Sequence, residues 1–174
     1  MNAADASLHP CARCAAVQRT CCQRAEILVT AGDQARIGAF LASGRGTPAT
    51  GDFVERRAPA DPEYVRPDPD DPNWLRYTVA ADGTRRMLRR APNGDCTFLG
   101  ATGCILPETV RPLVCRLYPY SYSERGLDGV DSEYCPTALL APDGRSMAAV
   151  LDIPATTAEG WRRQLYEELR DGTP

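Results

Sequence analysis

The sequence contains no lysine and a single histidine, and each absence excludes a kind of chemistry. All twenty basic residues are arginine, so no side chain is available for Schiff-base catalysis by lysine. One histidine, His9, excludes a catalytic zinc site built on two or three histidines. His9 precedes Cys11 by two residues and could complete a site of three cysteines and one histidine, but at this place in the chain we interpret it as a bystander.

Long hydrophobic runs are also lacking. No segment approaches roughly 18 consecutive apolar residues, so the sequence predicts no membrane-spanning helix. The opening stretch, MNAADASLHPCARCAAVQRTCC, has no basic region followed by an apolar run, and we expect no secretory signal peptide. These absences together predict a cytoplasmic protein without a membrane partner.

A net positive charge is lacking as well, since the formal net charge is −3 and the isoelectric point is about 5.2. Nucleic-acid binding needs a concentrated basic surface, so we expect no nucleic-acid partner. One local concentration of arginine exists, TRRMLRR at 84–90, and the acidic stretch DPEYVRPDPDDPNW precedes it. We interpret both as solvated stretches that partly neutralise each other.

Cysteine, by contrast, is abundant, with eight among 174 residues. A chain of this length can build a core without covalent cross-links, and we expect one domain over residues 1–174. In the reducing cytoplasm, clustered thiols are more often metal ligands or redox groups than structural disulfides. The cysteines therefore indicate function rather than a disulfide framework.

The pattern along the chain predicts an α+β fold: a small irregular domain with Cys-rich metal-binding loops, a short hairpin and a few helices. Residues 27–29 are typical of a short buried strand. Thr30 and Asp33 have the spacing of a capping box, which predicts a helix to about residue 42, ended by Gly44 and Gly46. The last helix is predicted at 156–170, where Trp161, Leu165 and Leu169 recur every four residues and Thr156 and Glu159 form a capping box.

The middle of the chain is rich in turn residues. We expect 44–73, rich in Pro, Asp and Gly, to be a long surface loop. A hairpin is predicted from strands at 74–80 and 84–90 around Asp82 and Gly83. The segment 92–136 cannot form a long helix because of its Gly and Pro content, although one helical turn at 108–114 is possible.

The cysteines form two groups in the sequence. Cys11 and Cys14 have the Cys-x-x-Cys spacing with which one tight turn directs two sulfurs at a metal. Cys21 and Cys22 are adjacent, and in an extended segment they would point to opposite faces and serve different roles. The second group consists of Cys96, Cys104, Cys115 and Cys135. Eight thiols permit two four-thiolate sites, or one such site with four spare cysteines.

Residues beside the second group could tune a metal centre. Arg111 and Arg116 bracket Cys115 and are candidate charge partners of a multi-thiolate anion; pairing with surface carboxylates is the alternative. Glycines at 94, 100 and 103 let loop N–H groups turn toward thiolate sulfur. We interpret Tyr118 as a core or turn residue rather than a catalytic one.

These motifs resemble a known family. CARC with the downstream CC, then C-TFLGATG-C-ILPETVRPLV-CRLYPY and YCP, are similar to the YkgJ-type cysteine-cluster family, a zinc- or iron-chelating domain. The resemblance covers roughly 12–45 and 94–136 and implies metal binding by the matching thiols, which are Cys11, Cys14, Cys21, Cys22, Cys96, Cys104, Cys115 and Cys135. The chain departs from the pattern in the six residues between Cys14 and Cys21, where the family is tighter, and in the 44–73 insert.

Three functions follow as hypotheses. The first is a metal-binding protein that holds zinc or an iron–sulfur cluster such as 4Fe–4S, as structure or electron carrier; Cys135-Pro136 favours the cluster. The second, implied by a related cysteine cluster in bacterial flagellin lysine N-methylases, is a part in protein lysine N-methylation, although the chain lacks a Gly-x-Gly-x-x-Gly nucleotide motif. The third is thiol–disulfide exchange through Cys11 and Cys14, which lack the preceding strand usual for that chemistry. A protein partner could contact 44–73 or 121–134.

Overall fold

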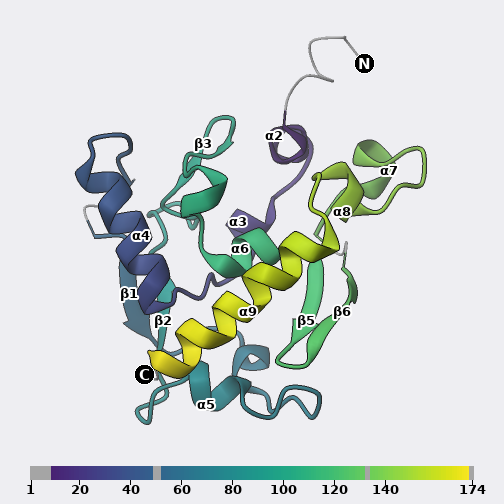
Figure 1. Cartoon of the computed structure of the whole chain (residues 1–174). Coiled ribbons are helices and arrows are strands. Elements are labelled where there is room, and N and C mark those ends of the chain that lie inside the picture. The colour runs from purple at the N-terminus through teal and green to yellow at the C-terminus, as the bar shows by residue number, and fades with distance from the viewer. Residues whose placement is uncertain (1–8, 49–51, 132–133, 173–174) are drawn as a thin grey trace.

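The computed structural model describes residues 9–48, 52–131 and 134–172. The parts of the predicted 44–73 loop and of the 121–134 segment that fall on 49–51 and 132–133 lie outside the described residues. The α+β prediction is confirmed, because several helices surround small antiparallel sheets in one small domain (Figure 1).

The helices are mostly short, and one long helix crosses the front of the molecule (Figure 1). The α-helices are α2 (Pro10–Ala15), α3 (Cys21–Arg24), α4 (Ala31–Ala42), α5 (Trp74–Thr78), α6 (Leu113–Leu117), α7 (Thr137–Leu140), α8 (Met147–Val150) and α9 (Ala155–Asp171). The 3₁₀-helices are η1 (Pro62–Val65) and η2 (Glu108–Val110).

The strands pair as two-stranded antiparallel sheets. They are β1 (Val54–Arg57) with β2 (Arg85–Leu88), β3 (Leu99–Gly100) with β4 (Gly103–Cys104), and β5 (Tyr120–Ser123) with β6 (Gly126–Val130). The prediction of short elements in 92–136 is confirmed, with η2 and α6 near the expected single turn.

Helix α4 begins where the sequence predicts. The Asp33 backbone N–H donates to Thr30 Oγ1 at 2.9 Å, and the Thr30 N–H donates to Asp33 Oδ2 at 3.1 Å. This reciprocal capping box satisfies two donors at the helix start. The helix ends at Ser43, and Gly44 follows with φ of 74°, a left-handed conformation that glycine adopts without strain.

The predicted hairpin of 74–80 with 84–90 is wrong. Residues 74–78 form α5, and β2 pairs instead with β1, which lies inside the predicted 44–73 loop. The turn itself exists, since Gly83 has φ of 80° and donates to the Ala80 carbonyl at 2.9 Å. Residues 74–78 form a helix rather than a strand because the helix lets Trp74 and Tyr77, three residues apart, both pack on the core around α9.

The strand expected at 27–29 is reduced to one bridge, Leu28 with Met87. The segment still runs beside β2, because Val29 N–H donates to the Arg86 carbonyl and Leu88 N–H to the Ile27 carbonyl. The expectation that the arginine-rich stretch is solvated is wrong for Arg85. Arg85 is 1% exposed, with its guanidinium 5.1 Å from the ring centroid of Tyr64.

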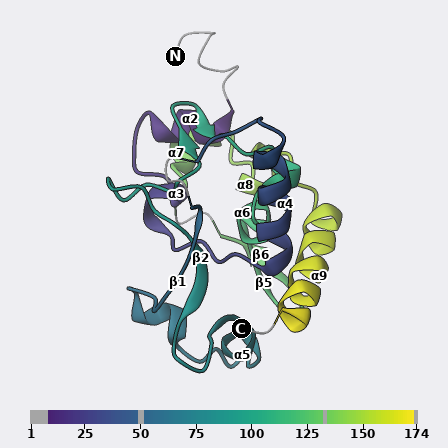
Figure 2. The same ribbon diagram turned by 90° about the vertical axis from the view of Figure 1, so that its left-hand side faces the viewer.

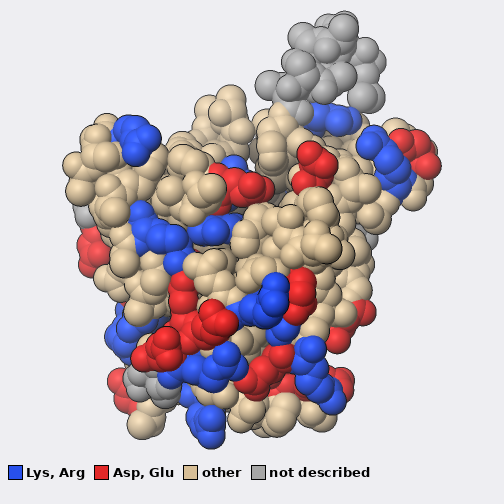
Figure 3. Space-filling model, in the orientation of Figure 1, with Lys and Arg blue, Asp and Glu red and all other residues tan. Residues whose placement is uncertain are grey.

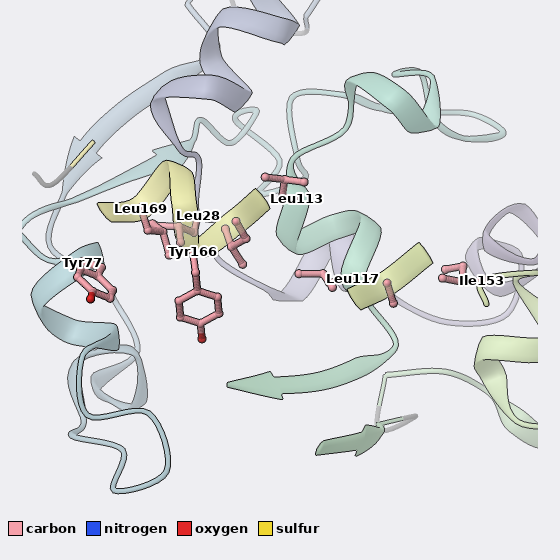
Figure 4. Close-up of a cluster of buried hydrophobic side chains, with 9 residues drawn as sticks. Leu28, Tyr77, Leu113, Leu117, Ile153, Tyr166 and Leu169 are labelled. Carbon is pink, nitrogen blue, oxygen red and sulfur yellow. The ribbon is translucent and has the colours of Figure 1, made fainter. Parts of the chain in front are cut away.

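Helix α9 confirms the predicted terminal helix, but its predicted capping box is wrong. Pro154 is the N-cap, so Thr156 lies within the first turn, and Glu159 pairs with Arg162 at 2.5 Å. The helix packs on a cluster that we call the helix core (Figure 4). Its buried members are Leu28, Tyr77, Leu113, Leu117, Ile153, Ala158, Leu165, Tyr166 and Leu169.

Ion pairs cover the outside of α9. Arg36 binds Glu168 at 2.5 Å, and Arg170 binds Glu124 at 2.9 Å. On the face shown in Figure 3, acidic and basic side chains are interspersed across the lower half. Across residues 9–48, 52–131 and 134–172, none of the helices has the length and apolar character needed to cross a bilayer.

Candidate metal centre

The cysteine-bearing elements extend from the middle of the molecule, where α3 and α6 lie, to the end opposite α5, where α2 and α7 lie (Figures 1 and 2). We call this part the thiol region: α2, α3, the β3–β4 hairpin with Cys96 before it, the outer face of α6, and Cys135 before α7. All eight cysteines are free thiols. Segments far apart in the sequence therefore lie in the same part of the molecule.

Helix α2 positions the first pair. His9 is its N-cap and accepts the Cys11 N–H at Nδ1, 3.2 Å away, while Pro10 occupies the first turn. Cys11 and Cys14, three residues apart on a helix, lie on the same face. The tight turn predicted for this pair is thus a helical turn. The His9 imidazole caps the helix through Nδ1.

Helix α3 corrects the prediction for the vicinal pair. Cys21 and Cys22 begin a helix rather than lying in an extended segment, and their two thiols hydrogen-bond to each other. The helix start is fixed because the Thr20 N–H donates to Gln23 Oε1 at 3.0 Å. The expectation of an extended segment with opposite faces is therefore wrong, whereas the separate roles of the two thiols stay a prediction.

Cys96 is held against α3 by backbone contacts. Its N–H donates to the Cys22 carbonyl at 2.9 Å, and Gln23 Nε2 donates to Asp95 Oδ1 at 3.0 Å. Arg90, which forms an isolated bridge with Cys96, also donates to the backbone carbonyls of Gln23, Ala25 and Gly94. These bonds join the two sequence groups of cysteines.

The β3–β4 hairpin brings Cys104 to the same place. Leu99 pairs with Cys104, and the turn passes through Gly103, whose φ of 106° suits glycine. A Cβ built on Gly103 would lie 3.9 Å from the Cβ of Cys11. The hairpin therefore lies directly against α2.

Helix α6 has two faces with different roles. Leu113 and Leu117 are both 0% exposed and belong to the helix core. Cys115, two residues from each, lies on another side of the helix, since residues two apart do not share a face. The helix is anchored because the Leu113 N–H donates to the buried Asp33 Oδ1 at 3.1 Å.

Cys135 joins from the C-terminal side. Its sulfur lies 3.3 Å from the hydroxyl oxygen of Tyr118. Helix α2 is tied to this segment, because Gln18 Nε2 donates to the Tyr134 carbonyl at 2.8 Å and Arg13 Nη2 to the Leu139 carbonyl at 3.0 Å.

Apolar packing separates the thiols into two sets. Cys96 is buried with Phe98 and Leu106, and Cys22 and Cys104 pack against that cluster. Cys14 is buried in a different cluster, which contains Leu140 and Met147 and against which Cys135 packs.

Electrostatic contacts centre on Cys22. The hydrogen bond from Cys21 lowers the pKa of Cys22 to about 7; burial opposes this, while Arg111, the residue's own N–H and Arg90 reinforce it. The Cys22 thiolate in turn contributes by charge repulsion to a raised pKa at six thiols, in most cases after the effect of burial. These are Cys11, Cys14, Cys21, Cys96, Cys104 and Cys115.

Burial is the main cause of the raised pKa values of the cysteine thiols. Burial and neighbouring thiolates raise the pKa of Cys11 to about 11 and that of Cys96 to about 12, and they raise the pKa of Cys115 well above its ordinary value. These thiols are protonated at neutral pH unless a cation favours the thiolate. A bound metal is such a cation, because coordination deprotonates the thiol.

The donor chemistry suits zinc or an iron–sulfur cluster, since soft thiolates select these metals. The side-chain positions are not those of a formed site: over the described ranges, no three His, Cys, Asp or Glu side chains form a group that could hold a metal ion. The cysteines are gathered without being convergent, and coordination would require the sulfurs to approach one another further.

The two candidate arginines differ. Burial raises the pKa of Cys104 and Cys11, and the charge of Arg111, which also hydrogen-bonds to Cys104, partly opposes that shift; the same charge helps to lower the pKa of Cys22. Arg116 instead donates to the carbonyls of Arg111 and Thr109 at 2.8 and 2.6 Å, so it shapes the loop that carries Arg111.

Two contributors were missed by sequence reasoning. Arg90 fastens α3 to the Cys96 segment, and the sequence offered only its membership of an arginine-rich stretch. Tyr118 was interpreted as a core or turn residue, yet its hydroxyl contacts Cys135. Its place three residues after Cys115 was a signal, because it follows the helical turn that presents that thiol.

Searches against models of protein families, curated proteins and solved structures returned no match to this chain.

Proposed function

We propose that this protein binds zinc or an iron–sulfur cluster through its eight cysteines and uses the metal as structure or electron carrier, as a member of the YkgJ-type cysteine-cluster family. The observation that carries the proposal is the gathering of free thiols around Cys22 from separate segments of the chain. Burial makes the ionised thiolates unfavourable in free energy unless a cation lies beside them. A cytoplasmic location belongs to the proposal, because free thiols persist there.

We further propose that the thiols divide into two four-thiolate sites. The first consists of Cys22, Cys96, Cys104 and Cys115, and the second of Cys11, Cys14, Cys21 and Cys135. Three members of the first set share one apolar cluster, and two members of the second share another. Cys115 has Cys22, Cys96 and Cys104 as its charge neighbours, which are the other members of the first set. Cys11 is influenced first by Cys22 and then by Cys135 and Cys14, and we assign it to the site of the latter two. Cys21 completes the second site by number. The hydrogen bond between Cys21 and Cys22 links the two sets.

The thiol–disulfide alternative receives less support at its predicted residues. A redox Cys-x-x-Cys pair needs a depressed pKa at its attacking thiol. Burial raises the pKa of Cys11 to about 11 and also raises that of Cys14. Metal binding explains these buried thiols better, because a metal supplies the missing positive charge.

The first test is elemental analysis with a visible absorption spectrum on protein purified without oxygen. Iron with acid-labile sulfide and a broad band near roughly 400 nm would identify a cluster, whereas colourless protein with two zinc ions would identify four-thiolate zinc sites. Protein that holds no metal after purification and after reconstitution with either metal would refute the proposal.

Stoichiometry tests the division. Cys115→Ser and Cys135→Ser should each remove half of the metal, and the double variant should remove all of it. Cys96→Ser combined with Cys115→Ser should remove no more than Cys115→Ser alone, because both changes fall in one site. Val114→Ala, beside Cys115 in α6, is the matched control and should keep full metal. Equal losses in all double variants would contradict two separate sites.

A further inference from the structure

A cavity of about 150 Å³ lies away from the thiol region and is lined by Asp68, Asp71, Trp74 and Tyr122. It lies where the loop before α5 meets the β5–β6 hairpin, near the bottom of Figure 1. Pockets for drug-sized ligands have about 300–1,000 Å³, so this cavity has room for a single small head group.

The two walls are fastened to each other. Asn73 Nδ2 donates to Glu124 Oε2 at 2.9 Å, and Arg125 Nη2 donates to the Asp70 carbonyl at 2.9 Å. The Tyr166 hydroxyl on α9 donates to Asp71 Oδ2. The shape of the pocket is therefore fixed by contacts from three segments before any ligand binds, which reduces the entropy that binding would cost.

The pocket has negative charge without a matching cation. Asp71 is 5% exposed, and its Oδ1 is buried and accepts no hydrogen bond. Within the described ranges neither Asp71 nor Asp68 forms an ion pair, and Asp68 Oδ1 accepts only the Asp70 N–H. Two neighbouring arginines have other carboxylate partners: Arg125 binds Asp70 at 3.0 Å, and Arg162 binds Glu159 at 2.5 Å. A third, Arg85, acts by its charge on Tyr122 but is not among the groups that shift the pKa of Asp71. A buried carboxylate without a cation is costly, so the pocket favours a positive ligand.

The other two walls are aromatic. The ring centroids of Trp74 and Tyr122 lie 6.3 Å apart with an angle of 69° between the ring planes. Two ring faces nearly at right angles, with carboxylates beside them, suit a compact organic cation, which aromatic faces attract. A divalent metal ion fits less well, because calcium and magnesium need about six or more oxygen ligands.

We propose that this pocket binds an alkylammonium head group, held by the Trp74 and Tyr122 rings and by the carboxylates of Asp68 and Asp71. A second copy of this chain cannot supply such a head group from a side chain, because the sequence contains no lysine. The ammonium therefore comes from another molecule, either a free amine or the lysine side chain of another protein.

The test uses the fluorescence of Trp74 in the full chain. The sequence has two tryptophans, so Trp161→Phe leaves Trp74 as the only reporter. Choline is titrated against its neutral isostere 3,3-dimethylbutanol, which has the same shape without the charge. Choline should change the emission with saturation, and the isostere should bind at least about tenfold more weakly.

Variants locate the site. Asp68→Asn, at an exposed position that should fold normally, should weaken choline binding several-fold, and Asp71→Asn should weaken it more. Asp152→Asn is the control, because it removes an exposed carboxylate that does not line the pocket, at a left-handed position that Asn tolerates. Equal binding of choline and the isostere, or equal effects of Asp68→Asn and Asp152→Asn, would overturn the proposal.

The source of the ammonium is distinguished by comparing free methylamine with a short peptide that has one lysine. A peptide that binds at least about tenfold more tightly than methylamine would identify a protein side chain, since contacts beyond the head group then add affinity. Equal affinities would identify a free amine. Failure of choline, methylamine and the peptide together would refute the pocket's assignment without bearing on metal binding.

Discussion

The helix core and the thiol region are stabilised in different ways. The helix core forms around the 17-residue α9 and buries nine side chains from five separate segments. The thiol region is built from α2 and α3, of six and four residues, and from two-residue strands. Helices this short are unstable by themselves in water. The comparison indicates that one region is stabilised by apolar burial around a long helix, whereas the other combines smaller apolar clusters with backbone tethers and, we propose, with metal.

Helix α6 is where the two regions meet. Its Leu113 and Leu117 belong to the helix core, while Cys115 belongs to the thiol region. Asp33 strengthens this junction, because its buried carboxylate accepts the Leu113 N–H and pairs with Arg36 at 2.5 Å. A ligand that binds Cys115 is therefore attached to a helix that burial already holds in position.

Removing the metal should produce the largest difference in local stability between the two regions. Metal at roughly a thousand times its Kd adds about 4 kcal/mol to the free energy of unfolding. After chelation, hydrogen exchange should accelerate at the Cys96 N–H and elsewhere in the thiol region, while the amides of α9 stay protected. Returning the metal should restore protection. Equal acceleration in both regions would show that they do not differ in this way.

Leu165→Ala should destabilise the helix core. Leu165 is 0% exposed, and removing a buried leucine side chain costs about 3 kcal/mol through lost burial and the cavity left behind. Urea denaturation should show this loss, while metal content below the unfolding transition stays unchanged. Ile105→Ala, at a side chain that is 41% exposed, is the control and should change stability little. Loss of metal from folded Leu165→Ala would contradict the separation of the two regions.

The sequence predicted the helix core better than the thiol region. Helix α9 and the start of α4 follow from periodic leucines and from Thr30 with Asp33, which are local signals. The pairing of β2 with β1 could not be read from the sequence, because it joins segments about thirty residues apart and depends on tertiary packing. The adjacency of Cys21 and Cys22 suggested opposite faces, because the capping-box spacing of Thr20 and Gln23, which starts α3, was not recognised.

The sequence predicted the chemistry of the thiols but not their arrangement in space. Eight cysteines in a chain of this kind indicated a shared centre, but not which thiols would lie together. The roles of Arg90 and Tyr118 depend on long-range contacts: Arg90 reaches carbonyls of α3 and the residue after it, and Tyr118 reaches Cys135. Such contacts have no sequence periodicity, so only the spacing of Tyr118 from Cys115 offered a signal, and Arg90 offered none.

Glu168→Gln should loosen the junction of α4 with α9. Burial raises the pKa of Glu168, but hydrogen bonds from Arg36, Thr30 and Gln164 outweigh it and lower that pKa below 4.5. Because the unfolded chain then binds the proton more tightly, this contribution is present above pH 4.5 and is lost as the pH falls through the lowered value.

The variant should therefore cost about 1.5 kcal/mol near pH 7, as expected for hydrogen bonds to a charged group, and less on acidification. Urea denaturation at pH 7 and pH 3.5 measures both quantities. Glu63→Gln is the control, because Glu63 lies in an exposed pair with Arg66 at 3.2 Å and should show little effect at either pH. A pH-independent cost at Glu168 would rule out the ionised carboxylate as the source of this stability.

The smallest expected effect is a difference in metal retention between two matched glycine variants, one inside the thiol region and one outside it. Gly103 and Gly83 have φ of 106° and 80°, and in each case alanine would be strained by about 1 kcal/mol. Nothing lies within 4 Å of a Cβ at Gly83, whereas at Gly103 the nearest atom is the Cβ of Cys11. Both variants should lose similar stability in urea, but only Gly103→Ala should also weaken metal retention against a chelator, because the strained turn moves Cys104 relative to Cys11. Equal retention in the two variants would mean that the hairpin does not position its cysteine for the metal.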